Sequence, residues 1–184
     1  MYTTYTTKFN LILILFLIPL SVLSQKYYSA VDVLGGVSQE GYSGLINYNH
    51  YISRESSIQG GVYVSFSEKE LYGIDIPYNN LTFNLGFVTT LLDNKFKTFS
   101  LNIGSGIIAG YEIINNGDKE LVNGALILND SGFIYGGFAT LELEKIIGDG
   151  DWNLLLKSNY FYHHNSDLGK HVSFVGLGFR IYIL

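Results

Sequence analysis

The sequence predicts an all-β fold: an eight-stranded antiparallel outer-membrane β-barrel with a filled polar interior, preceded by a cleaved signal peptide. Apolar and polar residues alternate along eight segments after residue 25, where no amphipathic helix period stands out. Charged residues make up 15% of the chain, against about 25% in typical soluble domains, while 47% of the residues are hydrophobic. The number of strands is even, as required in a closed antiparallel barrel whose two chain termini lie on the same side.

Residues 1–24 have the three parts of a signal peptide. Lys8 supplies a positive region, residues 11–20 (LILILFLIPL) an apolar region, and Val22-Leu23-Ser24 a cleavage site. An uncleaved membrane helix needs about twenty apolar residues, whereas this run is about half as long and contains Pro19. The chain has no cysteine, which excludes an acylated N-terminal cysteine, disulfides and thiolate metal sites.

Residues 25–184 are expected to form one barrel domain. The expected strands lie at about 26–37, 42–52, 57–69, 78–92, 97–113, 133–146, 151–163 and 171–184. With the mature N-terminus in the periplasm, short connections at 53–56, 93–97 and 147–150 fall on the periplasmic side. Outside lie the short connection 38–41 and the longer, more polar connections 70–77, 112–132 and 164–170. Such asymmetry is typical of outer-membrane barrels.

The polar face of the strands suits a crowded interior better than water. A soluble barrel should present Lys, Glu and Thr to water, whereas these positions hold small or amide side chains such as Asn84, Gly86 and Asn102. In the last strand Leu177 and Phe179 are expected to face lipid, and Arg180 to point inward. A secreted soluble barrel that binds an apolar ligand, as lipocalins do, remains a rival and requires apolar residues inside.

An interior ionic network is expected, because an eight-stranded barrel is just wide enough to be filled by side chains and isolated buried ions are unfavourable. Glu142 and Lys157 lie on consecutive strands, and Arg180 lies on the strand that closes against the strand of Asp32. The members of this network are Asp32, Glu142, Glu144, Lys157 and Arg180. A filled interior also excludes an open channel.

The residues give no positive sign of catalysis, and we expect no enzyme, no cofactor, no metal and no small-molecule substrate. The histidines His163, His164 and His171 lack a carboxylate at a ligand spacing, and the run 148–151 (GDGD) fits a hairpin turn better than a calcium loop. Nothing resembles a nucleophile elbow. Removing residues 1–24 takes away Lys8 and no acidic residue, so the net charge falls from −5 to −6, which disfavours direct nucleic-acid binding.

The connection 112–132 is too polar to bury, because it carries the turn-forming runs 115–120 (NNGDKE) and 129–132 (NDSG). Connections of this length are unusual unless they have a function. We therefore expect this connection at the outer surface.

Residues 101–144 resemble the TraO conjugal transfer protein family of Bacteroidetes conjugative transposons. The resemblance rests on the runs Ala109-Gly110-Tyr111-Glu112, Asn116-Gly117-Asp118-Lys119, Gly124-Ala125 and Phe133-Ile134-Tyr135-Gly136-Gly137, within about a quarter of the chain. It implies a non-catalytic, scaffolding envelope component of the mating apparatus. The partners that it implies are other conjugal transfer proteins, beside outer-membrane lipid.

The expected contacts with those partners are the loop residues Glu112, Asn116, Asp118 and Lys119, with the connection 164–170 beside them. A solvated loop with a preferred turn is an equal reading of the same residues. The alternative function is that of a general small outer-membrane barrel for envelope integrity or surface adhesion, unrelated to conjugation.

Overall fold

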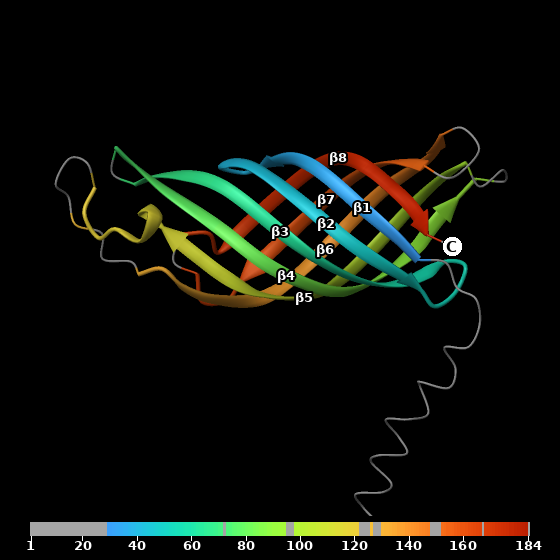
Figure 1. The fold of residues 1–184 in the computed structure, drawn as a ribbon, viewed down its shortest axis with the longest axis horizontal. Coiled ribbons are helices and arrows are strands. Elements are labelled where there is room, and N and C mark those ends of the chain that lie inside the picture. Colours follow the sequence, from blue (N-terminus) through green and yellow to red (C-terminus); the bar gives the residue numbers. More distant parts are fainter. Residues whose placement is uncertain are drawn as a thin grey trace, which may run out of the picture.

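The computed structural model is a closed antiparallel barrel in which each strand pairs with the next and β1 closes against β8 (Figure 1). It describes residues 29–71, 73–94, 98–121, 126, 130–147, 152–166 and 168–183. The strands are β1 (Ser29–Ser38), β2 (Gly41–Tyr51), β3 (Ser56–Leu71), β4 (Ile74–Asp93), β5 (Phe99–Ile114), β6 (Gly132–Ile147), β7 (Trp152–His163) and β8 (His171–Ile183). The expected signal peptide lies outside the described residues. Among the described residues, no helix is long and apolar enough to cross a membrane.

The two ends of the barrel differ in their connections. The terminal end holds the start of β1, the end of β8 and the connections β2–β3, β4–β5 and β6–β7. The loop end holds the other four connections, of which 115–131, between β5 and β6, is the longest. In Figure 1 the loop end lies to the left and the terminal end to the right.

One expected long connection is absent. Residues 70–77 were expected to form an outer loop, but β3 continues to Leu71 and pairs there with Ile74 of β4. Gly73 in the turn has a φ of +78°, a conformation that glycine adopts at little cost. Alternation continues through β4, so that Ile76 and Tyr78 become buried, and burial of these two side chains explains why the strands extend.

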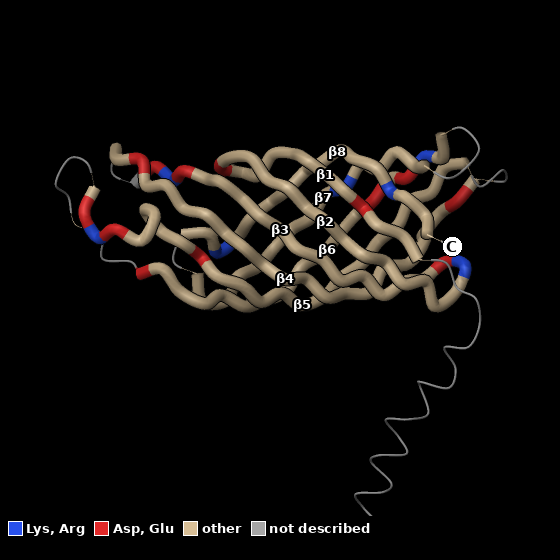
Figure 2. The backbone as a smooth tube through the Cα atoms, in the orientation of Figure 1, with Lys and Arg blue, Asp and Glu red and all other residues tan. Residues whose placement is uncertain are grey.

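The outer wall of the barrel is apolar, as the alternation predicts. Ile107, Leu177 and Phe179 are 65%, 55% and 47% exposed at outward positions. Trp152 packs edge-on against Phe179, with ring centroids 6.2 Å apart, while Tyr162 lies near the opposite end of the same strand. Figure 2 shows acidic and basic residues gathered towards the two ends and few along the wall between them. Such a wall suits lipid rather than water.

The interior is filled in layers from the loop end to the terminal end. A small cluster of Ile76, Tyr78, Ile114 and Leu168 lies at the loop end. The next layer consists of Leu34, Leu45, Tyr63, Ile108, Phe138, Leu155, Phe161, Val172 and Phe174. Gly106 makes room in this layer, because a Cβ there would lie 2.6 Å from the Phe138 ring and 2.2 Å from the Leu85 carbonyl oxygen. Polar and charged side chains fill the part nearer the terminal end.

Candidate functional site

The charged interior site is assembled by strand register. Asp32 of β1 lies directly opposite Arg180 of β8, and Glu142 of β6 lies opposite Lys157 of β7. Because side chains alternate along a strand, these residues and Glu144 all point into the barrel. The five residues of the expected network are therefore brought together by four strands, β1, β6, β7 and β8.

Arg180 is the centre of the network. Its Nε lies 2.7 Å from Asp32 Oδ1, its Nη2 lies 2.9 Å from Glu142 Oε2, and its Nη1 lies 2.7 Å from Glu144 Oε2. The other cation, Lys157 Nζ, lies 2.6 Å from Glu142 Oε1. The Lys157 and Glu142 side chains are fully buried and that of Arg180 is 3% exposed, so solvent screens these pairs little.

Neutral side chains complete the network, and the sequence did not single them out. Gln59 accepts a hydrogen bond of 2.8 Å from Lys157 and donates to Glu142 at 3.3 Å. Tyr182 donates to Glu144 Oε1 at 2.9 Å, and Asn153 donates to the same oxygen. Inward alternation places all three amide or hydroxyl groups in the barrel, but nothing in a sequence shows which inward polar group touches an ion.

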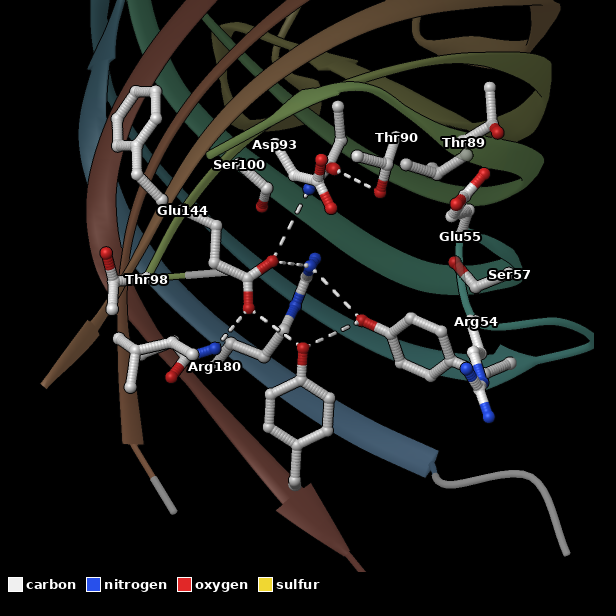
Figure 3. A pocket seen from close by; sticks show the side chains of 17 residues that line it. Arg54, Glu55, Ser57, Thr89, Thr90, Asp93, Thr98, Ser100, Glu144 and Arg180 are labelled. Carbon is white, nitrogen blue, oxygen red and sulfur yellow. Dashed lines mark hydrogen bonds and ion pairs between the residues drawn. The ribbon is translucent and has the colours of Figure 1, made fainter. Parts of the chain in front are cut away.

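A polar cavity of about 200 Å³ extends from this network to the terminal end. Arg180, Glu144, Asn153 and Tyr182 lie on its inner side. Its rim carries Arg54, Glu55 and Asp93 from the connections and strand ends, which are exposed. Figure 3 shows Arg54 and Glu55 across the cavity from Glu144 and Arg180. The sequence did not indicate this cavity.

At the loop end, residues of the connection between β7 and β8 fold into the barrel. Leu168 is 4% exposed and packs in the loop-end cluster, and its carbonyl oxygen accepts a hydrogen bond of 2.5 Å from Lys69 Nζ. Gly169 O lies 2.6 Å from His163 Nδ1. This connection, which we call the plug (residues 164–170), was expected at the outer surface. Only part of it is there, because Ser166, Leu168 and Gly169 are buried.

The sequence had indicated that Glu112 lies on an outer loop surface, but the structure places it elsewhere. It belongs to β5, is 3% exposed, and accepts hydrogen bonds from Ser166 Oγ at 2.8 Å and from the Gly169 amide at 3.3 Å. The strand continues to Ile114, so alternation turns Glu112 inward. Its carboxylate therefore holds the plug and is not available as a contact for another protein.

The other three expected contact residues are exposed on the loop 115–131. Asn115, Asn116 and Gly117 form a single 3-10 turn with positive φ, which Asn and Gly tolerate. The Asn115 side chain donates to the Asp118 and Glu120 carbonyl oxygens at 2.9 and 3.1 Å. Asn116 and Asp118 are exposed, and Lys119 forms an exposed ion pair of 2.9 Å with Asp130.

The histidines of the sequence differ in their surroundings. His163 is buried beneath the plug, whereas His164 and His171 are exposed at the loop end, where His171 Nδ1 lies 2.7 Å from the Tyr160 hydroxyl. In the part of the chain that the structure describes, no group of three or more His, Cys, Asp or Glu side chains is placed to hold a metal ion.

Known structures share this fold at low sequence identity. Neisserial surface protein A (NspA) matches with a TM-score of 0.58 and 10% identity, over 85% of this chain and 97% of that one. The N-terminal β-barrel domain of Pseudomonas aeruginosa OprF matches with a TM-score of 0.50 and 10% identity, over the same shares of the two chains. The chain is thus an outer-membrane-type β-barrel.

Sequence comparison identifies the family. No curated protein sequence matches the chain. The model of a family described as conjugative transposon protein TraO matches residues 30–183, which span the eight strands except Ser29 of β1 and include both long loop-end connections. The chain therefore belongs to the TraO family of conjugative transposon proteins.

Proposed function

We propose that this protein is a non-catalytic, structural component of a conjugative transfer apparatus, inserted in the outer membrane as a scaffold for other transfer proteins. The observation that carries the proposal is the combination of family membership with an apolar outer wall around a filled interior. The interior holds ion pairs and hydrogen-bonded amides, and the plug occupies the loop end. Such a barrel suits anchoring rather than conduction.

The orientation follows from the two longest connections, 115–131 and 164–170, which both lie at the loop end, whereas the other two connections of that end are tight turns. Outer-membrane barrels have short periplasmic turns and longer external loops. The terminal end then faces the periplasm, and the loop end, with the loop 115–131, faces outward. In this orientation the exposed residues Asn116, Asp118 and Lys119 are available at the cell surface, and the cavity opens towards the periplasm.

The role in transfer is tested by an in-frame deletion of the gene in a donor strain, followed by a count of transconjugants per donor. We expect transfer to fall to the detection limit and to recover when the gene is supplied in trans. Wild-type transfer together with altered envelope integrity or adhesion would contradict the proposal and favour a general envelope barrel.

The surface contacts are tested by a triple variant, Asn116→Ala, Asp118→Ala and Lys119→Ala. The Lys119 ion pair with Asp130 is exposed at both partners, so its loss should change stability by no more than about 1 kcal/mol. We expect reduced transfer at an unchanged level of barrel in the outer membrane. A matched control is Glu70→Ala, an exposed acidic residue near the end of β3 on the same side. Equal transfer by both variants would exclude these three residues as contacts.

A further inference from the structure

We infer that the plug (residues 164–170) is a pH-sensitive switch, docked in the barrel while His163 is neutral and released when His163 takes up a proton. The inference concerns the loop end alone and does not depend on a role in conjugation. Release uncovers the loop-end cluster, in which Tyr78 and Ile114 pack with Leu168 while the plug is docked.

The first observation is the way in which His163 contacts the plug. Its Nδ1 lies 2.6 Å from the Gly169 carbonyl oxygen, and its backbone amide donates to the Lys170 carbonyl oxygen at 2.9 Å. A carbonyl oxygen only accepts hydrogen bonds, so Nδ1 carries a proton, and in the neutral ring Nε2 then presents a lone pair. The docked plug therefore fixes the tautomer of the neutral imidazole.

The second observation is that a proton on Nε2 has no partner in this place. His163 is fully buried, and the described residues supply no hydrogen-bond partner for its Nε2. Its ring stacks against the Phe161 ring, with centroids 6.4 Å apart and an angle of 14° between the planes. A second proton would create a buried positive charge with an unpaired donor, which is unfavourable. Release exposes the ring to water, which stabilises the charged form.

The strands on either side of His163 bring no charge to it. Gly136 of β6 lies opposite His163. The inward side chains that flank Gly136 are Ile134 and Phe138. On β8 the nearest inward side chain is that of Val172. These neighbours are glycine or apolar residues, so they do not stabilise an imidazolium.

Two charged side chains hold the plug from other strands. Lys69 of β3 donates to the Leu168 carbonyl oxygen at 2.5 Å, and its charge repels an imidazolium. Glu112 of β5 accepts a hydrogen bond from the Gly169 amide at 3.3 Å, whereas His163 contacts the carbonyl oxygen of that residue. Protonation of Glu112 would also loosen the plug, so the experiment separates the two groups.

The direction of the pH dependence follows from these contacts. Histidine is the side chain that ordinarily changes its charge between about pH 5 and pH 8. Because the ring is neutral when the plug is docked and charged when it is released, release takes up one proton, and the docked state loses stability as the pH falls. The ratio of released to docked plug then rises by about tenfold for each pH unit below about 6.5, the usual pKa of a hydrated histidine.

The experiment measures hydrogen exchange at the Gly169 amide of the mature protein in detergent micelles, by nuclear magnetic resonance between about pH 7.5 and pH 5. That amide donates to Ser166 Oγ in the docked plug. Its protection factor, which is corrected for the intrinsic effect of pH on exchange, should fall by about tenfold per pH unit below about 6.5. The Leu45 amide, on a strand paired on both sides, should stay protected and so exclude unfolding of the barrel. A constant protection factor at Gly169 would overturn the inference.

Histidine variants assign the response to one ring. His163→Asn keeps an N–H donor near the position of Nδ1 but does not titrate, so the protection factor of Gly169 should no longer depend on pH, whatever its level. The matched controls are His164→Asn and His171→Asn, at exposed histidines, and both should keep the wild-type pH dependence. A wild-type pH dependence in His163→Asn, or its loss in either control, would overturn the inference.

Two further variants test the carboxylates of this region. Glu112→Gln removes the acidic group that holds the plug, and Asp167→Asn removes the acidic residue of the plug that lies outside the described residues. Both variants should keep the wild-type pH dependence at Gly169, even if the level of protection changes. Loss of the pH dependence in either one would assign the switch to that carboxylate and overturn the inference.

The wild-type ring supplies a readout that needs no variant, so the test remains valid if His163→Asn does not fold. The nitrogen shifts of the His163 ring report its protonation. We expect the ring to become charged over the same pH range in which the Gly169 amide loses protection. A ring that becomes charged while Gly169 stays protected would overturn the inference.

Discussion

At the scale of single residues, the main feature is the interior network, in which several ions share one buried space. Alternation and closure of the barrel were enough to predict that Asp32 and Arg180 meet, because they fix both the face and the neighbouring strand. The role of Gln59 was not predictable in this way. An inward glutamine has the same pattern whether it packs against an aliphatic side chain or, as here, joins Lys157 to Glu142.

Replacing Lys157 by methionine should destabilise the barrel by about 3–5 kcal/mol, the usual effect of removing one partner of a buried ion pair. Glu142 would keep only Arg180 as a cationic partner. Urea titration of unfolding in lipid vesicles measures the change. The control is Lys119→Met, which breaks an ion pair exposed at both partners and should change stability by no more than about 1 kcal/mol. Equal effects of the two variants would show that the buried network contributes little to the stability of the barrel.

At the scale of elements, the strands were predictable and their connections were not. Period-two alternation located all eight strands to within a few residues, because it repeats along each strand. The plug has no such repeat. Its inward turn depends on groups far away in the chain, such as Lys69 and Glu112, which supply partners for backbone atoms of Leu168 and Gly169. Glu112 looked like a loop residue in the sequence because the plug residues that accompany its carboxylate inside the barrel lie far away in the chain.

The plug should loosen when Leu168 is shortened to alanine. The change removes buried apolar contacts worth about 2 kcal/mol, so the Gly169 amide should exchange its hydrogen about thirtyfold faster. That amide donates to Ser166 Oγ at 2.8 Å and is therefore a local reporter of the closed plug. Leu126→Ala, at a residue that is 74% exposed on the neighbouring loop, serves as the control. Unchanged exchange at Gly169 would show that the hydrogen bonds alone hold the plug.

At the scale of the whole molecule, the inside and the outside of the barrel differ in polarity. Its wall is apolar on the outside and its interior is polar near the terminal end, which is the reverse of what a soluble lipocalin-like carrier needs. The composition already indicated this arrangement. The cavity did not follow from composition, because it depends on which inward side chains leave space, and that depends on side-chain packing across the barrel.

Whether the wall faces lipid can be tested by a substitution that places one charge at its middle. Leu177 lies halfway along β8, opposite Leu156 and Gly35, and is 55% exposed. Leu177→Arg should destabilise the barrel folded in vesicles by about 2–4 kcal/mol, because it places a charge near the centre of the bilayer. Tyr42→Arg, at the loop end of β2, should change stability by about 0–1 kcal/mol, since it lies near the interface. Urea unfolding in vesicles compares the two variants. In a soluble barrel both substitutions would be exposed to water and tolerated alike, so a large difference between them is evidence that the wall is embedded in lipid.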